Sequence, residues 1–463
     1  MEAHHLPACL SVRDGRLYMD GLHLTSLTRR FGSPLFVFSR QQVEASIKSL
    51  LSLNGPDDPP VQVHYACKAN SNLGLLRVIR AASLNLEVNS GGELWKGRQA
   101  GFTGSQILFN GVAKTDDEVT QALQAGCTLI VDSLAELDRL FGISRRLGKR
   151  ANILLRLAPH LDSATPECFQ TAHSESKFGM EMAEAFRALQ ESIASEYIDE
   201  VGLHLHQGGQ IYDVETFHGT VDFIQGFLQE WADTHPASRW KPSTINLGGG
   251  LPIRFMHLLA TAEQLSEEKR RVVGSELDIA ALKRILEPLR RQGHRLALEP
   301  GRYIVANAAV LLTQVINQKR RQAGEVWLLL DGGYSMLMDT FTYRWLFELV
   351  APDRINEPHN VAYCVGGPLC DQADVFHAMS DDGYLPRFRC LPDNIKAGDA
   401  LAFLDVGGYS LEQMNEYNGR LQPAALLIER DGGLRIIRRR QGYEDLCPYD
   451  VEEVVESQTS AAE

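Results

Sequence analysis

Short apolar runs alternate with longer amphipathic segments between about residue 36 and residue 300. Runs of this length are typical of buried strands, whereas apolar residues three or four positions apart indicate helices with one buried face. Regular alternation of the two predicts parallel strand–helix units. The expected strands are Val61–Ala66, Leu84–Val88, Gln106–Phe109, Thr128–Val131, Ile153–Leu157, Val201–Leu205, Thr244–Leu247 and Arg295–Leu298.

Helices are expected between these strands, and eight such units favour an α/β fold of the TIM type, a (β/α)8 barrel. The rival is an open, doubly wound sheet, which favours a Gly-x-Gly-x-x-Gly turn after its first strand. The chain has no such turn after Val61–Ala66. The expected helices include Leu73–Ala82, Gly92–Ala100, Asp116–Ala125, Leu134–Leu147 and Met182–Ala194.

The pattern changes after Arg302, where β-type runs are separated by turn signals such as Asp331-Gly-Gly. This texture predicts a mostly antiparallel C-terminal β domain, a sandwich or barrel. An early hairpin around Asp14-Gly15 is expected to pack with it. We therefore predict an N-terminal segment over 1–35, a barrel over 36–302 and a β domain over 303–463. The late strands expected are Ala309–Val315, Val326–Leu330, Ala400–Val406, Ala425–Glu429 and Leu434–Arg438.

Composition narrows the class of protein. A chain of 463 residues fits two or three domains, and its net charge of −13 argues against a nucleic-acid partner. The eight cysteines form no C-x-x-C pair, so no metal site is suggested. The chain shows neither a signal-peptide pattern nor an apolar run near the ~18 residues of a membrane span. We expect a cytoplasmic protein with no membrane contact.

The distinctive short motifs fall at the ends of the expected strands, where barrel enzymes carry their chemistry. A lysine amine bonds covalently to an aldehyde cofactor, and a carboxylate supports a protonated pyridine nitrogen. A glycine triplet exposes backbone N–H groups that bind a phosphate. This set indicates a site for pyridoxal 5'-phosphate. The motifs are Tyr65-Ala-Cys-Lys68-Ala-Asn, Glu87-Val-Asn-Ser-Gly-Gly-Glu, His204-Leu-His206-Gln-Gly-Gly, Asn246-Leu-Gly248-Gly249-Gly250 and Glu299-Pro-Gly301-Arg302.

In this order, and with three further motifs, they resemble the alanine-racemase-like, fold-type III family of pyridoxal-phosphate decarboxylases, in its diaminopimelate and ornithine decarboxylase group. The resemblance implies a lyase that releases CO2 from the α-carbon of an amino acid. It also implies a homodimer whose subunits share active sites. The further motifs are Ser176-Lys-Phe-Gly, Gly366-Gly-Pro-Leu-Cys370-Asp371 and Asp405-Val-Gly-Gly-Tyr409.

The resemblance also implies a role for each residue. Lys68 holds the cofactor covalently, His206 stacks on its ring, and Glu299 faces its pyridine nitrogen. Cys370 reaches the partner's site and donates a proton to the α-carbon. The implied phosphate and cofactor contacts are Gly248, Gly249, Gly250, Gly301, Arg302 and Tyr409, and the implied substrate contacts are Arg302, Arg344, Asp371 and Tyr409.

Three residues depart from the family pattern. Glu87 stands where the family more often has aspartate, and Gly408 stands where it has alanine. Gly209 stands where the family often has a serine that contacts the phosphate, so backbone amides must do more there. We also expect a low pKa for Lys68, because a desolvated amine near a cation loses its proton easily.

The substrate is less clear from the sequence. Diaminopimelate decarboxylases carry an Arg-Pro that holds a distal carboxylate, and ornithine decarboxylases an aspartate that holds a distal ammonium. The segment from Asp331 to Arg344 has neither, and Arg344 lies at about the place of the aspartate. A cation there favours a negative group. We expect a diamino or acidic amino acid or a conjugate of one, as in siderophore or other specialised biosynthesis.

Two alternatives stay open. One is an amino-acid racemase on the same fold, although chain length and the Cys370 motif favour decarboxylation. The other is a non-catalytic regulatory homologue that binds a protein partner. Such homologues tend to lose cofactor residues, whereas Lys68, His206 and Glu299 are all present.

Overall fold

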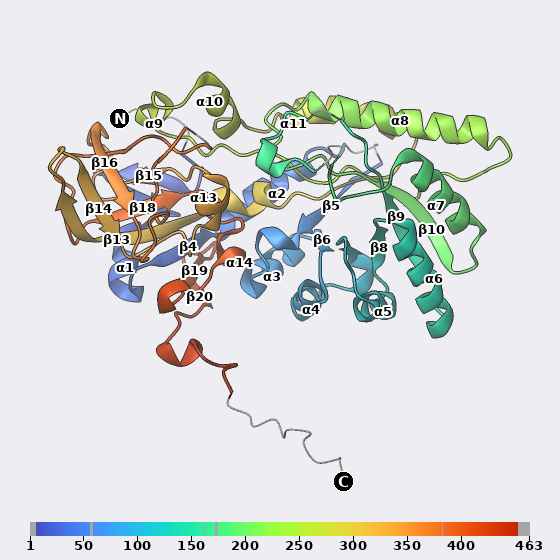
Figure 1. Cartoon of the computed structure of the whole chain (residues 1–463), viewed down its shortest axis with the longest axis horizontal. Coiled ribbons are helices and arrows are strands. Elements are labelled where there is room, and N and C mark those ends of the chain that lie inside the picture. Colours follow the sequence, from blue (N-terminus) through green and yellow to red (C-terminus); the bar gives the residue numbers. More distant parts are fainter. Residues whose placement is uncertain (1–5, 56–58, 162, 172–174, 382, 452–463) are drawn as a thin grey trace, which may run out of the picture.

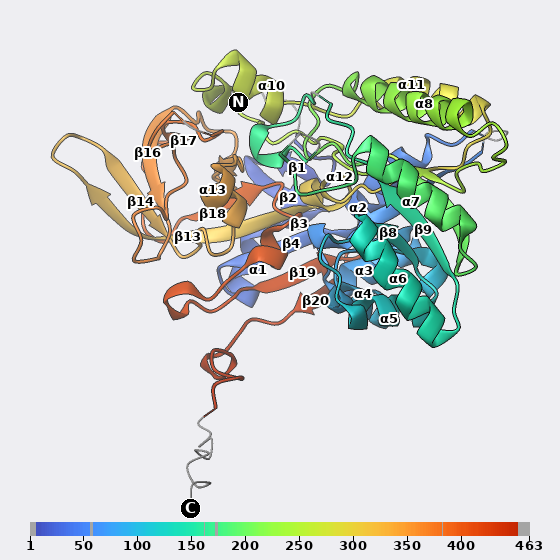
Figure 2. The ribbon, with the colours of Figure 1, turned by 45° about the vertical axis from the view of Figure 1, so that its right-hand side comes forward.

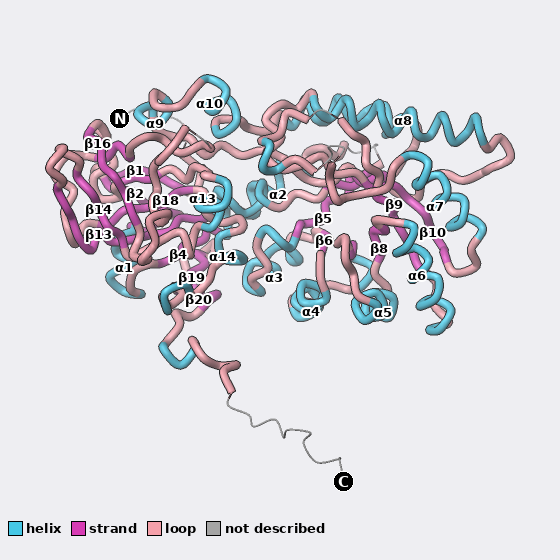
Figure 3. Tube along the Cα trace, in the orientation of Figure 1, coloured by secondary structure: helices cyan, strands magenta, loops and turns pink. Residues whose placement is uncertain are grey.

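The computed structural model describes residues 6–55, 59–161, 163–171, 175–381 and 383–451. A strand–helix barrel and a β-rich part lie side by side along the long axis of the molecule (Figure 1). Helices ring the barrel strands, whereas the β-rich part carries most of its residues in strands and loops (Figure 3). No helix in the described part of the chain is long and apolar enough to cross a membrane.

The barrel consists of eight parallel strands, and all eight are the strands that the apolar runs predict. It closes where Leu296 of β12 pairs with Val61 of β5. The predicted (β/α)8 barrel is therefore confirmed, and the open-sheet alternative is excluded by this closure. The strands are β5 (Val61–Ala66), β6 (Asn85–Val88), β7 (Ile107–Phe109), β8 (Thr128–Val131), β9 (Ala151–Arg156), β10 (Ile198–His204), β11 (Ile245–Asn246) and β12 (Leu296–Leu298).

The helices around the barrel begin where the sequence offers caps. The hydroxyls of Ser90, Thr115 and Ser133 each accept the backbone N–H three residues on, which satisfies a donor of the first turn. The longer helices are α3 (Leu73–Ala81), α4 (Gly91–Gln99), α5 (Asp116–Ala125), α6 (Leu134–Leu147), α7 (Met182–Ala194), α8 (Thr216–Thr234) and α11 (Ile279–Arg291). Shorter ones are α9 (Leu259–Ala262), α10 (Glu267–Val273) and α12 (Arg302–Val305).

The C-terminal part is a mostly antiparallel sheet, as predicted, with parallel pairing only between β14 and β16 and between β19 and β4 in the described residues. Its strands are β13 (Ala309–Arg320), β14 (Val326–Leu330), β15 (Leu349–Val350), β16 (Val361–Gly366), β17 (Arg389–Leu391), β18 (Ala400–Leu404), β19 (Ala424–Ile428) and β20 (Leu434–Arg438). Two short helices interrupt it, α13 (Met338–Tyr343) and α14 (Ser410–Gln413).

The N-terminal segment packs on this sheet. The hairpin of β1 (Leu10–Arg13) and β2 (Arg16–Met19) turns at Asp14 and Gly15, both with positive φ, and β3 (Leu22–His23) follows. Leu17 shares a buried apolar cluster with Leu312 and Leu404. After α1 (Leu24–Phe31), β4 (Leu35–Ser39) enters the large sheet between β13 and β19, and α2 (Arg40–Leu51) leads to the barrel. Figure 2 shows these early strands against the β domain.

Two of the hydrogen bonds between the barrel mouth and the β domain connect the loop after β5 with the loop after β18. The N–H of Tyr409 donates to the Ala69 carbonyl oxygen at 2.6 Å. The side-chain amide of Asn70 donates to the Gly407 carbonyl oxygen at 2.9 Å. These contacts hold the loop after β5 against the loop after β18, which are far apart in the sequence.

Candidate active site

Lys68 lies directly after the first barrel strand, in a short turn over Cys67–Ala69. Its Nζ is 3.9 Å from Glu87 Oε2, at the end of β6. The Lys68 side chain is 39% exposed, while that of Glu87 is fully buried. Neither carboxylate oxygen of Glu87 has a hydrogen-bond partner among the described residues. The amine thus faces a cavity with a buried carboxylate beside it.

The charges around Lys68 raise its pKa, which corrects our expectation of a low value. Burial opposes the ammonium form, but the nearby Glu87, Tyr409 and Glu299 outweigh it. The expected low value depends on a cation near the amine, whereas the structure places the Glu87 carboxylate beside it. Burial in turn raises the pKa of the Glu87 carboxyl to about 7, although Lys68 counteracts it. The amine therefore keeps its proton at neutral pH, whereas the Glu87 carboxyl beside it titrates there.

Glu299 follows the last barrel strand and is buried among hydrogen-bond donors. Its Oε1 accepts from Asn246 Nδ2 at 2.7 Å, and its Oε2 lies 3.3 Å from His204 Nε2. Burial favours the neutral acid, but His204 and then Lys68 hold the pKa of Glu299 far below its usual range. Glu299 is therefore an ionised carboxylate at the centre of the barrel mouth.

His206 is held by the glycine triplet. Its Nδ1 accepts the Gly249 N–H at 3.1 Å, so the proton of the neutral ring lies on Nε2. Burial lowers the pKa of His206 well below its usual value, and Lys68 lowers it further. The ring is thus a neutral, flat wall of the cavity.

The triplet itself has no room for side chains. A Cβ on Gly249 would lie 2.3 Å from the Glu299 carbonyl oxygen, and one on Gly250 2.3 Å from the Gly208 carbonyl oxygen. The Gly250 N–H has no acceptor among the described residues. Backbone of this kind binds an anion such as a phosphate.

Gly209, which lacks the family's serine, lies against an aromatic ring. A Cβ there would meet Phe169 Cβ at 3.4 Å, and the Gly209 N–H donates to the Phe169 carbonyl oxygen at 3.0 Å. Phe169 therefore occupies the space beside the position of the missing hydroxyl. Gly301 also needs its missing side chain, since a Cβ would lie 2.8 Å from that of Ala69.

Arg302 is enclosed by aromatic rings. Its guanidinium carbon is 4.7 Å from the ring centre of Tyr409 and 5.1 Å from that of Phe169. Its Nη1 also lies 3.4 Å from Asp339 Oδ2 in α13. Cation–π and ionic contacts of this kind fix a guanidinium in one orientation.

One cavity of about 320 Å³ collects most of the predicted residues. Those that line it are Lys68, His206, Gly250, Glu299, Gly301, Arg302 and Tyr409. Gly248 and Gly249 adjoin it through the backbone of the same loop. Phe178 of the Ser176-Lys-Phe-Gly motif and Tyr343 also line it. So do Cys168 and Phe169, which no sequence motif indicated.

Besides Gly248 and Gly249, three predicted residues are not among those that line this cavity. Cys370 is exposed, and its N–H donates to Asn418 Oδ1 at 2.6 Å. Asp371 Oδ2 accepts from the Tyr334 hydroxyl at 3.0 Å. Arg344 ends α13 with a positive φ and lies beside Gly383. The roles of these three stay predictions.

Arg156 is a charged residue of the barrel mouth that our sequence reasoning missed. It ends β9, its guanidinium is 4.3 Å from the Phe178 ring centre, and Asp132 lies 3.7 Å away. An arginine at the end of an otherwise apolar strand is a signal that was visible in the sequence. The partners of Arg156 were not visible, because they come from other strands and loops.

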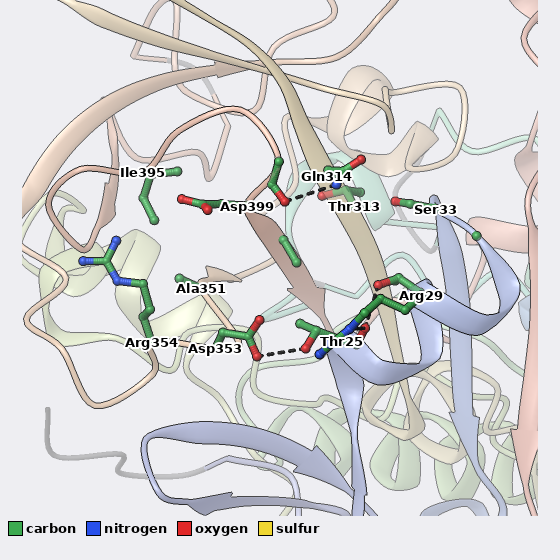
Figure 4. Close-up of a pocket in the computed structure, with 14 residues that line it drawn as sticks. Thr25, Arg29, Ser33, Thr313, Gln314, Ala351, Asp353, Arg354, Ile395 and Asp399 are labelled. Atoms are coloured by element: carbon green, nitrogen blue, oxygen red, sulfur yellow. Dashed lines mark hydrogen bonds between the residues drawn. The ribbon is translucent and has the colours of Figure 1, made fainter.

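A second cavity, of about 590 Å³, lies between α1 and strands of the β domain (Figure 4). Its polar groups largely bond to one another or to neighbours. Asp353 accepts from the Thr25 hydroxyl at 2.8 Å, Gln314 donates to the Gly398 carbonyl oxygen at 3.1 Å, and Arg354 pairs with Glu357. Its lining includes none of the motifs at the strand ends, so we assign the chemistry to the smaller cavity.

The functional groups in and around the smaller cavity fit pyridoxal phosphate. They include an amine for an aldehyde, an ionised carboxylate for a pyridine nitrogen and free backbone N–H for a phosphate. The glycine backbone leaves the space that such a group needs.

Comparisons with known proteins agree with this fit. Residues 41–306 match the family model described as "Pyridoxal-dependent decarboxylase, pyridoxal binding domain". The chain is 29% identical to the diaminopimelate decarboxylase of Methanocaldococcus jannaschii over 96% of both chains. It is 30% identical to that of Halalkalibacterium halodurans, over 94% of this chain and 95% of the other.

Solved structures extend the likeness to the whole fold. The M. jannaschii diaminopimelate decarboxylase in complex with L-lysine aligns with a TM-score of 0.83 at 27% identity, over 97% of this chain and 99% of the other. A lysine/ornithine decarboxylase of Vibrio vulnificus in complex with putrescine aligns with a TM-score of 0.69 at 18% identity, over 88% and 97%. At that identity the second likeness concerns the fold alone.

Proposed function

Because the chain belongs to the family of pyridoxal-dependent decarboxylases, we propose that it removes the α-carboxylate of a diamino or acidic amino acid, or of a conjugate of one. The chain is a carboxy-lyase, and its cofactor is pyridoxal 5'-phosphate. The observation that carries the assignment is Lys68 beside Glu87 in one cavity with the ionised Glu299.

When bound, pyridoxal phosphate supplies an aldehyde for the substrate amine and a ring that accepts the electron pair left when CO2 departs. Lys68 binds the cofactor, and the buried Glu87 carboxyl lies beside its amine. Glu299, kept ionised by His204 and Asn246, stabilises a proton on a basic nitrogen that faces it. The neutral His206 offers a flat surface without a competing charge.

We further propose a homodimer in which Cys370 of the partner subunit returns a proton to the α-carbon and Asp371 of the partner subunit contacts the substrate. Two features support this. Cys370 is exposed outside its own cavity. The exposed rings of Phe341 and Tyr417 stack on Tyr334 close to it, and aromatic surface of this kind is enriched at interfaces.

Mixing two inactive variants tests the shared site. Lys68→Ala and Cys370→Ala should each lose most activity, and a mixture that exchanges subunits should recover up to about a quarter of the wild-type rate. The recovery arises because half of the dimers are mixed and each mixed dimer has one intact site. A mixture that stays as inactive as its components contradicts the shared site.

The reaction is tested by CO2 release from the cofactor-loaded enzyme. The substrates are L- and D-lysine, ornithine, arginine, glutamate and meso-diaminopimelate, with conjugates of these amino acids as a second panel. Release from one substrate by the wild type, and none by Lys68→Ala, supports the proposal. Interconversion of the lysine enantiomers without CO2 release replaces it with the racemase alternative.

A further inference from the structure

Arg302, which aromatic rings of the active-site cavity surround, already has an anionic partner. Arg302 Nη1 lies 3.4 Å from Asp339 Oδ2, and both side chains are almost wholly buried. Asp339 pairs with Arg302 but is not itself among the residues that line the cavity. A carboxylate in this place reduces the positive potential that Arg302 presents to a bound molecule.

The guanidinium cannot easily turn away from Asp339. The rings of Phe169, Phe255, Trp345 and Tyr409 surround it, with ring centres 4.7–5.7 Å from its central carbon. Asp339 is held as well, because its own carbonyl oxygen accepts the Trp345 N–H at 3.2 Å. The pair is therefore a fixed part of the wall.

The other cation that lines the cavity is also balanced. Lys68 has Glu87 at 3.9 Å, and Arg156, just behind the lining, has Asp132 at 3.7 Å. Among the described residues, each of these three cations of the barrel mouth thus has a carboxylate partner. A substrate with a second carboxylate would find no unbalanced positive charge there, and its own charge would meet that of Asp339.

We propose that Asp339 is a specificity-determining residue that acts through Arg302, and that it makes the enzyme select amino acids without a carboxylate at the distal end. This inference rests on the proposed α-decarboxylation. It assigns the distal selection to the Arg302–Asp339 pair rather than to Arg344, which lies outside the cavity lining. The favoured substrates are monocarboxylic diamino acids, and the disfavoured ones carry a dicarboxylate skeleton such as that of diaminopimelate.

The test compares wild type with Asp339→Asn, which keeps the shape and removes the charge. The probes are L-lysine and meso-diaminopimelate for turnover, and pimelate for binding by calorimetry to the holoenzyme. Wild type should show a kcat/KM for lysine at least about tenfold above that for diaminopimelate. Asp339→Asn should lower this ratio about tenfold, mainly through KM, and bind pimelate about tenfold more tightly.

Two controls separate charge from structure. Asp339→Glu keeps the charge and should keep the wild-type preference, and Asp116→Asn, on exposed α5, should behave as wild type. An equal loss for both substrates in Asp339→Asn, with unchanged pimelate affinity, overturns the inference. A wild-type preference for diaminopimelate also overturns it. That result comes from the wild type alone, so it does not depend on whether a variant folds.

The proposed function fails separately from this inference. If wild type releases CO2 from no amino acid, the proposed reaction is wrong. Calorimetry then still decides about Asp339, because tighter pimelate binding by Asp339→Asn than by wild type supports the charge effect. Equal pimelate affinities in that case overturn it.

Discussion

The cavity at the barrel mouth and the cavity beside α1 differ in the charged groups that they bury. The one at the barrel mouth is the smaller, about 320 Å³ against 590 Å³, yet it adjoins a buried carboxylate without a hydrogen-bond partner and contains an ionised Glu299. The polar groups of the one beside α1 bond to one another or lie exposed, as Arg29 does. Burying a charge costs free energy unless it is paired and hydrogen-bonded, and buried titratable groups with shifted pKa values cluster at functional sites.

The difference shows that volume does not locate the chemistry. The strand ends and the glycine-rich backbone locate it instead. They bring Lys68, Glu299 and the triplet Gly248–Gly250 together around one cavity. Substitutions at Lys68, Glu299, Glu87 and Arg29 test this contrast.

Replacing Lys68 by alanine should abolish the barrel-mouth chemistry. The variant loses the covalent attachment of the cofactor, so the rate of CO2 release should fall about 10³-fold or more. The measurement is CO2 release at saturating substrate. Lys149→Ala removes an exposed lysine of the same barrel and should keep the wild-type rate. A rate for Lys68→Ala within tenfold of wild type would remove Lys68 from the mechanism.

Glu299→Gln should have the next largest effect. The change keeps the size of the side chain but removes the negative charge that faces His204. A ring nitrogen that loses its anionic partner holds its proton less well, so kcat should fall about 10²-fold. Steady-state kinetics measure this, with Glu287→Gln as the control, a half-buried carboxylate of α11 that pairs with Arg291. An unchanged kcat would show that the carboxylate has no catalytic role.

Glu87→Gln should change the pH dependence of stability. In the unfolded chain this carboxyl titrates near 4.5, but the folded cofactor-free protein holds its proton until about pH 7. The unfolded state therefore releases the proton first, and stability falls as pH rises through this window. Glutamine cannot titrate, so the variant lacks this part of the fall.

Urea unfolding at pH 5 and pH 8 measures the effect. The wild-type free energy of unfolding should drop by about 1–3 kcal/mol more than that of Glu87→Gln. Glu118→Gln is the contrasting control, because backbone N–H groups stabilise its ionised form and lower its pKa. Identical pH dependence in wild type and Glu87→Gln would mean that Glu87 does not titrate in this range.

Arg29→Ala in the larger cavity should have the smallest effect. Its side chain lines the cavity of Figure 4, which shares no lining residue with the cavity at the barrel mouth. The kcat and KM of the variant should stay within about twofold of wild type. A tenfold loss of activity in a folded Arg29→Ala would break the contrast between the two cavities.

The sequence predicts much of this architecture because its strands are buried on both faces. Val61–Ala66 is a mostly apolar run and Thr128–Val131 a nearly continuous one, and the structure has strands with those same bounds. Three of the helices that the apolar periodicity predicts begin with a capping hydroxyl, at Ser90, Thr115 and Ser133. Local patterns thus suffice wherever one element follows its own periodicity.

Local sequence patterns do not predict contacts between segments that are distant in the sequence. Nothing local connects Arg302 with Asp339, which are 37 residues apart, or brings β4 into the sheet beside β13. The raised pKa of Lys68 depends on Glu87, which belongs to the next strand. Motifs therefore predicted which residues meet at the barrel mouth. Which carboxylate pairs with which cation there could be seen only in the folded structure.

The most direct test of the central claim is to locate the cofactor on the chain. The holoenzyme is reduced with borohydride, digested, and analysed by mass spectrometry for a peptide that carries a pyridoxyl phosphate group. The account predicts this mass on the peptide that contains Lys68, and none on wild type from which the cofactor was removed. A label on another lysine, or no labelled peptide from an active holoenzyme, would contradict the assignment of the barrel mouth as the active site.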